Sequence, residues 1–421
     1  MKSFSLRACL LACALAAFGA RAEAAPLSPG EELRISLLTM SPGDPAFTKF
    51  GHDALLVENT ATGATRVYNY GTFVFDSPWL AVAFLRGNLR YWLSVSSLSS
   101  VVRHYAAENR SIFAQELRIE AAERARIARL LEGTERSDAR YYKYDYYRDN
   151  CATRVRDVID GAIAGRLRAA SNGPAPFTYR QETLRLTADD VPLALGLDVA
   201  MGPLIDRPLS TWESEFLPAR LQAAVRSVRV PGANGDEPLV VSERVLLPAK
   251  GRTTRDAPPG LLPPLLATGL ALGALWISLG VAAGRGSRAA RGALSTALPL
   301  LGLAAGLLGC TIAGLFSLTD HAVTYYNANV LLATPWSVAL PAFARGISRG
   351  DVRALGRAGA LCTASLASST LVLVALPFYG QRNGEFVALF LPLWLGASAA
   401  IFLFRRGLSS GAASDNRRPA R

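Results

Sequence analysis

YYRDNCATRVRD (residues 146–157) holds the one cysteine of this chain that lies outside its apolar segments. Asp149 and Asn150 are good helix caps, and beyond Cys151 the apolar residues recur at helical spacing, at positions 155, 158, 159, 162 and 163. The pattern predicts a helix that begins at Cys151 and buries the face carrying the thiol. A thiol in the first turn lies at the positive end of the helix macrodipole, which predicts a lowered pKa and a nucleophilic thiolate. The alternative is a small buried side chain without chemistry, which is what most free cysteines are.

The first residues have the composition of a secretory signal peptide. A basic start, an apolar run and small residues ending in Ala-x-Ala occupy residues 1–24, so cleavage is expected after Ala22 or Ala24. A lipoprotein-like box, Leu-Leu-Ala-Cys, ends at Cys13, but the apolar run continues past it. The mature chain is therefore expected outside the cytoplasm, where proteins pair their thiols or avoid them. An unpaired Cys151 in that compartment is either reactive or accidental.

Five apolar stretches follow a linker rich in Pro, Gly and charge at 251–260, and they predict an all-α membrane domain over 261–405. They cover residues 261–283, 293–317, 328–344, 358–378 and 385–404. The third stretch is short and holds Pro335 and Pro341, but five spans place every arginine-rich loop on the cytoplasmic side, as the positive-inside rule requires. The formal charge of +12 is thus chiefly a topology signal, and nucleic acid is not expected as a partner. The remaining segment, 406–421, is expected to be a disordered cytoplasmic tail.

The segment 25–250 is predicted to be one exported domain of the α+β class. Alternating apolar and polar residues predict strands, and helical spacing predicts helices between them. The predicted strands are 32–40, 52–59, 66–73, 89–97 and 111–119, and the predicted helices are 77–88, 97–109 and 121–133. The helix that begins at Cys151 is expected to pack on the antiparallel sheet that these strands form.

A nucleophilic thiol needs a base, and the exported domain has only two histidines. His52 opens a predicted strand, which gives its imidazole a rigid mount. His104 lies on a predicted helix and is interpreted as a surface or packing residue. Asn69 and Tyr70 lie on the neighbouring predicted strand, and Asn69 is the candidate for the group that orients the imidazole.

Aromatic and basic residues around the thiol are candidates for substrate contact. Tyr146 and Tyr147 end a tyrosine-rich stretch. One of them could line an acyl groove or donate a hydrogen bond to an oxyanion. An aromatic strand at the edge of the domain explains the same pattern. Arg154 either pairs with Asp157, three residues along the helix, or holds a lipid phosphate.

Two further candidates, His321 and Asn329, lie where the chain passes from the second apolar stretch to the third. Polar groups beside a membrane span are costly unless they are used, which suggests that the pair positions a substrate at the outer mouth of the membrane domain. The sequence shows no metal-ligand spacing and no phosphate or dinucleotide loop, so no metal and no cofactor are expected.

Three parts of the chain resemble the Lnb family of bacterial lipoprotein N-acyltransferases. They are FGHDALLV with VYNYGTF (50–57 and 67–73), DNCATRVRD (149–157) and TDHAVTYYNANVLL (319–332). By this resemblance Cys151 is the nucleophile, His52 the base and Asn69 the polar third member. The order of His before Cys is also similar to that of permuted NlpC-type, papain-like thiol enzymes such as lecithin:retinol acyltransferase. Those enzymes have a second histidine at the third position, so Asn69 is a departure from their pattern.

These features together predict a multi-pass protein of the inner membrane with its N-terminal domain in the periplasm. Its expected activity is the transfer of an acyl chain from a phospholipid or diacylglyceryl group to an amine, such as a lipoprotein N-terminus, through a cysteine thioester. Two alternatives stay open: an envelope cysteine peptidase or amidase of the NlpC type, and a non-enzymatic module that binds envelope lipids or proteins.

Overall fold

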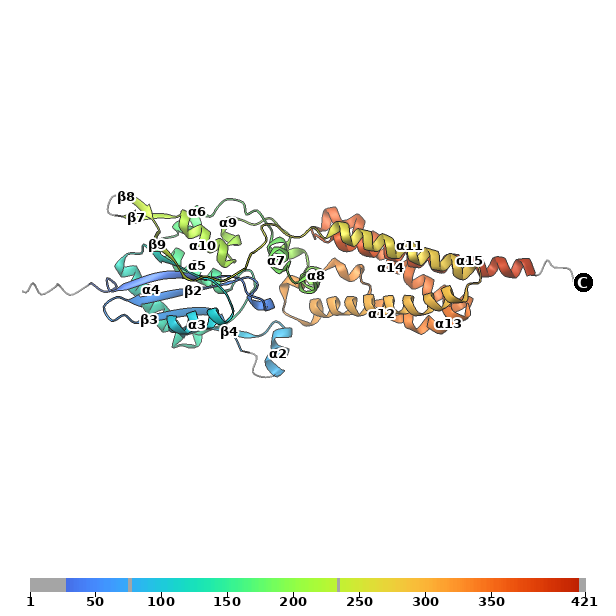
Figure 1. The fold of residues 1–421 in the computed structure, drawn as a ribbon, viewed down its shortest axis with the longest axis horizontal. Coiled ribbons are helices and arrows are strands. Elements are labelled where there is room, and N and C mark those ends of the chain that lie inside the picture. The colour runs from blue at the N-terminus through green and yellow to red at the C-terminus, as the bar shows by residue number, and fades with distance from the viewer. Residues whose placement is uncertain (1–27, 75–77, 233–234, 416–421) are drawn as a thin grey trace, which may run out of the picture.

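A computed structural model describes residues 28–74, 78–232 and 235–415. It confirms the predicted fold class, with an N-terminal α+β domain followed by an all-helical part (Figure 1). The predicted signal peptide, 1–24, lies outside the described residues. Residues 248–261, all of them described, carry no helix or strand and connect the two parts.

The N-terminal domain is built on a seven-stranded sheet in the order β6-β4-β3-β2-β1-β5-β9, with every neighbouring pair antiparallel. Its strands are β1 (Leu33–Met40), β2 (His52–Asn59), β3 (Thr65–Thr72), β4 (Arg90–Ser96), β5 (Ile112–Leu117), β6 (Tyr141–Lys143) and β9 (Val240–Leu247). The five strands predicted from residue alternation are confirmed. A separate hairpin pairs β7 (Arg229–Gly232) with β8 (Gly235–Pro238).

Helices cover both faces of this sheet. Successive side chains of a strand point to opposite faces, so Leu55 and Val57 of β2 face one helical layer and Ala54 and Leu56 face the other. The first layer consists of α4 (Ala121–Glu135), α5 (Cys151–Ala162) and α10 (Pro218–Ser227), and the second of α3 (Leu98–Ala107). The predicted helices at 97–109 and 121–133 are therefore confirmed as α3 and α4.

Short helices complete the domain. The predicted helix at 77–88 forms as α2 (Pro78–Leu85), in the connection between β3 and β4. The rest are α6 (Arg166–Ala170), α7 (Tyr179–Thr187), α8 (Val191–Ala200), α9 (Thr211–Ser214), η1 (Ala46–Thr48), η2 (Asp138–Arg140) and η3 (Pro203–Ile205). Helices α7 and α8 lie at the junction with the helical part (Figure 1).

The C-terminal part has five segments that are long and apolar enough to cross a membrane: 262–284, 288–318, 328–349, 352–375 and 384–410. Its elements are α11 (Leu262–Gly284), α12 (Arg288–Leu318), η4 (Ala322–Thr324), η5 (Ala328–Leu331), η6 (Pro335–Phe343), α13 (Ala344–Arg349), α14 (Val352–Tyr379) and α15 (Gly384–Asp415). The third segment is largely 3₁₀-helical, and two prolines in it remove backbone N–H donors. Because α15 continues to Asp415, the tail predicted to be disordered from residue 406 begins as helix.

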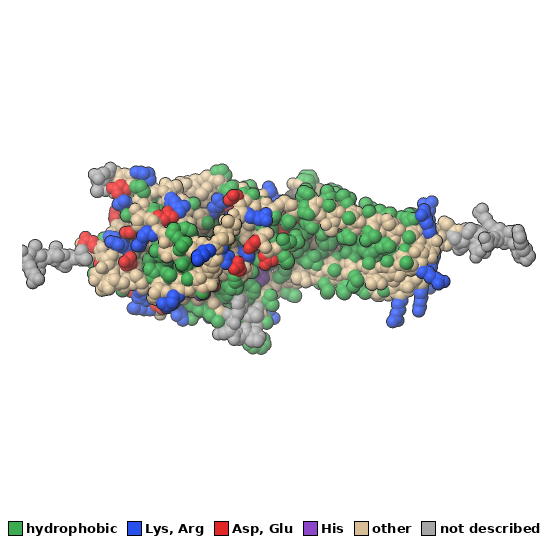
Figure 2. All heavy atoms as spheres, in the orientation of Figure 1, with side chains coloured by type: hydrophobic (Ala, Val, Ile, Leu, Met, Phe, Trp, Pro, Cys, Tyr) green, Lys and Arg blue, Asp and Glu red, His purple; other side chains and the backbone are tan. Residues whose placement is uncertain are grey.

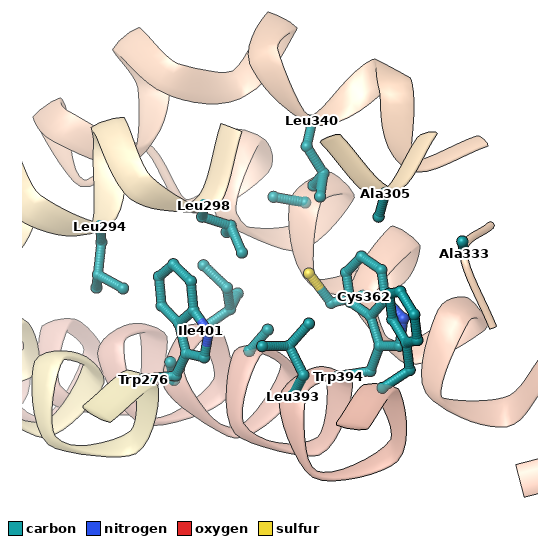
Figure 3. Close-up of a cluster of buried hydrophobic side chains, with 14 of the residues drawn as sticks. Trp276, Leu294, Leu298, Ala305, Ala333, Leu340, Cys362, Leu393, Trp394 and Ile401 are labelled. Atoms are coloured by element: carbon teal, nitrogen blue, oxygen red, sulfur yellow. The ribbon is translucent and has the colours of Figure 1, made fainter. Parts of the chain in front are cut away.

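Close packing of small and large residues holds the helical part together. A Cβ added to Gly273 would lie 2.6 Å from the carbonyl oxygen of Pro392, so α11 and α15 approach closely there. The buried core around Cys362 includes Leu393 and Trp394 (Figure 3), and the indole of Trp394 donates to the carbonyl of Leu332 over 2.9 Å. Figure 2 shows apolar side chains along the helical part and Lys and Arg at the end away from the sheet domain.

A buried polar network fastens the end of α8 to the helical part. The side-chain amides of Asn327 and Asn329 both donate to the carbonyl of Val199, over 2.8 and 2.9 Å. The backbone N–H of Gly202 donates to the carbonyl of Val323 over 2.8 Å. These bonds fix the sheet domain at one end of the helical part.

Candidate active site

Cys151 is the first residue of α5, as the cap residues before it predict. Asn150 caps the helix by a reciprocal pair of hydrogen bonds with Thr153, and its side-chain amide donates to the carbonyl of Phe216 over 3.0 Å. The thiol faces the sheet and is 6% exposed. The start of the helix, and with it the thiol, is held by bonds to a distant part of the chain.

The sulfur of Cys151 has polar neighbours on β2, on α5 itself and in the loop after β6. The backbone N–H groups of Asp53 and Ala152 and the side chain of Tyr144 form hydrogen bonds with it. Burial, reinforced by the nearby Asp53 carboxyl, nevertheless raises the pKa of the thiol to about 11 against the effect of these bonds. The expectation of a lowered pKa is therefore wrong in this structure, because desolvation outweighs the helix macrodipole.

Gly71 of β3 lets the sheet approach the thiol closely. Its φ is +84°, and a Cβ added there would lie 3.1 Å from the Tyr144 ring and 3.7 Å from the Cβ of Cys151. Only a glycine suits this conformation and this space without strain. Gly71 thus brings β3, the ring of Tyr144 and the thiol together.

His52 opens β2, and Asn69 lies on the neighbouring strand, as predicted. The side chain of Asn69 is hydrogen-bonded to the imidazole. Burial and, less strongly, the positive charge of Arg110 lower the pKa of His52 to about 4, and the bond with Asn69 opposes this shift. The imidazole is therefore neutral near neutral pH, which is the form that accepts a proton.

The thiol and the imidazole lie near the same end of β2, but on opposite faces of the sheet. Cys151 contacts the backbone N–H of Asp53, the residue directly after His52. Strand alternation directs the His52 side chain to the Asn69 face and the Asp53 side chain to the face that α5 covers. Within the described ranges, no hydrogen bond joins the imidazole to the thiol. For His52 to accept the thiol proton, its imidazole has to turn round the end of β2 to the face that α5 covers.

Asp53 is the residue that reasoning from the sequence missed. Its carboxyl is fully buried, accepts a 2.8 Å hydrogen bond from the Thr39 hydroxyl, and has a pKa that burial raises to about 8. Its Oδ2 finds no hydrogen-bond partner among the described residues. The sequence could have revealed it, because Asp53 shares the period of two with Leu55 and Val57, which predicts an acidic side chain on the same buried face of β2.

A cavity of about 170 Å³ lies between the sheet domain and the helical part. Tyr144, Tyr146 and Phe84 line it from the sheet domain, and His321 lines it from the loop after α12. The rings of Tyr146 and His321 stack at 6.0 Å, and His321 Nε2 lies 3.0 Å from the carbonyl oxygen of Phe84. Tyr144 connects this cavity to the site, because it lines the cavity and bonds to the thiol of Cys151.

Comparison with protein families identifies the domain that carries this site. Residues 27–185 match the family model of the Lnb N-terminal periplasmic domain. Residues 27–185 belong to the family of Lnb N-terminal periplasmic domains. The matched range contains Cys151, His52, Asn69 and Tyr144, all of which are described residues. No curated protein and no solved structure matches the chain, so the permuted papain-like arrangement of the Lnb domain stays a prediction.

Arg154 of the Lnb domain has a different partner from the expected one. Its guanidinium forms two hydrogen bonds to Asp149, of 2.6 and 2.8 Å, and lies 3.6 Å from the centre of the Tyr142 ring. Asp157 pairs with Arg156 instead. Asp149 therefore already occupies the donors of the Arg154 guanidinium that the sequence suggested for a lipid phosphate. Tyr70 is buried in the core against α5 and also lies near this guanidinium, at 5.7 Å.

Tyr147 and Asn329 do not line the cavity, and both make contacts within the fold. The Tyr147 hydroxyl bonds to that of Thr183 over 2.7 Å, and its ring packs in a separate apolar cluster. Asn329 is 1% exposed, and its side-chain oxygen accepts from Asn383 over 2.8 Å while its amide holds Val199. Of the six predicted substrate-binding residues, Tyr146 and His321 are the pair that the structure brings to the cavity.

Within residues 28–74, 78–232 and 235–415, no group of three or more His, Cys, Asp or Glu side chains is arranged to hold a metal ion. The polar atoms around Cys151 are instead hydrogen-bond donors and neutral acids. Such a set can stabilise an oxyanion or hold an ester carbonyl.

Proposed function

We propose that this protein is a cysteine acyltransferase of the inner membrane, with its Lnb domain in the periplasm. The acyl donor is a phospholipid or a diacylglyceryl group, and the acceptor is an amine such as a lipoprotein N-terminus. The observation that carries the proposal is the cavity between the Lnb domain and the loop after α12, which contacts Cys151 through Tyr144. A lipid ester lies at the bilayer surface, and this cavity lies where candidate span α12 ends.

The distribution of arginines supports the periplasmic orientation. The ends of α11 and α12 that point away from the Lnb domain carry Arg285, Arg288 and Arg291, and basic side chains gather at that end of the molecule (Figure 2). In contrast, the loop 319–327 at the Lnb end has no Lys or Arg. The positive-inside rule then puts the arginine-rich end in the cytoplasm.

In the first step the Cys151 sulfur attacks the ester carbonyl of the donor lipid, and His52 accepts the thiol proton. This role requires the imidazole to turn round the end of β2, because in the described structure it lies on the face opposite α5. The carbonyl oxygen becomes an oxyanion, and the N–H groups of Asp53 and Ala152, which already contact the sulfur, are the nearest donors to it. When the intermediate collapses, the ester C–O bond breaks and the departing alkoxide takes the proton from His52. The products are a thioester on Cys151 and a lysolipid alcohol.

In the second step the acceptor amine attacks the thioester carbonyl. His52 removes the amine proton, the C–S bond breaks, and the proton returns to the Cys151 sulfur as the amide leaves. The sum of both steps is ester plus amine to alcohol plus amide, without an oxidant or a further reactant. Since the resting thiol and imidazole are both neutral, proton transfer accompanies the attack on the ester and no ion pair precedes it.

Mass spectrometry of envelope lipoproteins tests the proposal in cells that depend on this protein for N-acylation. Cys151→Ser should remove the N-terminal acyl chain from their lipoproteins. Cys310→Ser is the matched control, because Cys310 is an exposed residue of α12 outside the site, and it should keep full acylation. Lipoproteins that stay fully N-acylated with Cys151→Ser would contradict the proposal.

The burial of Cys151 and the raised pKa of its thiol favour a second candidate, a non-enzymatic module that binds envelope lipids. In that case Cys151 is a packing residue, and Cys151→Ala changes the stability of the fold but not its cellular function. This alternative is tested in cells that carry Cys151→Ala. If they lose lipoprotein acylation while the amount of the protein in the membrane is unchanged, Cys151 is catalytic and the non-enzymatic alternative is excluded.

A further inference from the structure

Helix α2 is an apolar helix at the surface, and among the described residues several of its large side chains are exposed. Its eight residues, PWLAVAFL, include no charged side chain. Trp79 is 81% exposed, Leu85 63% and Val82 39%. Large apolar side chains gathered on one short helix indicate an interaction site, because soluble surfaces rarely expose them together.

The C-terminal end of α2 is fastened to the end of a candidate membrane span. Span α12 ends at Leu318, and two residues later the N–H of Asp320 donates to the carbonyl of Arg86 over 2.9 Å. His321 Nε2 lies 3.0 Å from the carbonyl oxygen of Phe84. Figure 1 shows α2 beside the junction of the two parts. The helix is therefore held at the level where candidate span α12 ends.

The apolar surface of the span extends to the same level. Phe316 and Leu318, in the last turn of α12, are 45% and 78% exposed. Beyond α2 the chain carries the exposed Arg86, at a height suited to lipid phosphates. An exposed tryptophan, an apolar helix and a flanking arginine form the pattern of an element that lies in the bilayer interface.

We propose that α2 lies in the outer boundary between lipid headgroups and acyl chains, with Trp79 and Leu85 inserted among the lipids and Arg86 at the phosphates. A lipid surface is favoured over a protein partner because the hydrogen bonds to Asp320 and His321 fix the depth of α2 at the end of a span. Insertion does not depend on acyl transfer. Since Phe84 of α2 also lines the cavity beside Tyr144, the inserted helix forms a wall between that cavity and the lipids.

Quenching of tryptophan fluorescence by lipids brominated near the carbonyl end of their chains tests this inference. The full-length protein is reconstituted in phosphatidylcholine nanodiscs with and without such lipids, and the emission of Trp79 is obtained as the difference between wild type and Trp79→Phe. We expect the brominated lipids to remove most of this difference emission. The matched control is Trp212, which packs against Arg156 in the Lnb domain. Its emission, obtained with Trp212→Phe, should not change.

A second reporter guards against a local effect of the Trp79 substitution. Leu85→Trp in the Trp79→Phe background places an indole at the other end of α2 and should restore quenching by brominated lipids. Emission of either reporter that is quenched by aqueous iodide and is unaffected by brominated lipids would overturn the inference. The test has no catalytic readout, so its result is independent of whether Cys151 forms a thioester.

Discussion

Replacing Asp53 with asparagine should stabilise the full-length protein at neutral pH, and by less as the pH falls. The Asp53 carboxyl is fully buried, and its pKa rises from 3.8 to about 8. Between these values the folded protein keeps a proton that the unfolded chain has released. Because the folded state binds more protons, the stability linked to Asp53 is fully present below the unfolded pKa and is lost as the pH rises toward 8.

The size of the effect follows from this window. Each pH unit inside it changes the free energy of unfolding by about 1.4 kcal/mol, so the wild type loses about 3 kcal/mol between about pH 5 and about pH 7.5. With asparagine at this position the free energy of unfolding does not fall in this way, because the amide does not ionise. Its carbonyl oxygen can still accept a hydrogen bond from the Thr39 hydroxyl. At roughly 2–4 °C per kcal/mol, the gap in Tm between the variant and the wild type should widen by several degrees over this pH range.

Differential scanning fluorimetry of the full-length protein in detergent at both pH values measures that gap. Asp138→Asn is the matched control, because Asp138 lies exposed at the start of η2 and its substitution should give no pH-dependent gap. A gap for Asp53→Asn that is equal at both pH values, or a less stable variant at the higher pH, would refute the reasoning about this buried carboxyl.

Three further outcomes follow from the geometry around the thiol. Alkylation of Cys151 by iodoacetamide near pH 8, followed by intact mass, should be about 100-fold slower than that of a free cysteine. The reason is that the pKa of its thiol is about 11 and not 9.0, so less thiolate is present. An equal rate would contradict the raised pKa. Tyr144→Phe removes a hydrogen bond to the sulfur of Cys151. It should lower the rate of lipoprotein acylation about tenfold with little change in Tm. An unchanged rate would exclude Tyr144 from the reaction. Gly71→Ala should destabilise the fold by about 1–3 kcal/mol in thermal melts, since φ at Gly71 is +84° and the Tyr144 ring lies 3.1 Å from the new Cβ. An unchanged stability would refute this close packing.

Residue patterns predicted the elements that position the site. Alternation in 52–59 and 66–73 predicted the two strands that carry His52 and Asn69, because one face of each strand packs on a core. The cap before Cys151 predicted the start of α5, since Asn150 supplies the oxygen that the first turn needs. These signals are local in the sequence, and for that reason they could be read from it.

The electrostatics of the site could not be predicted in the same way. The shift in the pKa of Cys151 depends on burial beneath β2 and β3, which no local pattern gives, and burial reverses the sign expected from the helix macrodipole. The partner of Arg154 is Asp149 before the helix, although spacing along the helix favoured Asp157, because the chain before α5 folds back beside it. The contact between Tyr146 and His321 joins two parts of the chain that only the tertiary structure brings together.

An acyl-enzyme on Cys151 is the central claim, and intact-mass spectrometry tests it most directly. The full-length protein is incubated in phospholipid nanodiscs of one defined acyl chain, without an amine acceptor. The account predicts that the wild type and Cys310→Ser gain the mass of one acyl chain, that hydroxylamine removes it, and that Cys151→Ala gains nothing. A wild type that gains no acyl chain, or an adduct that persists in Cys151→Ala, would contradict it.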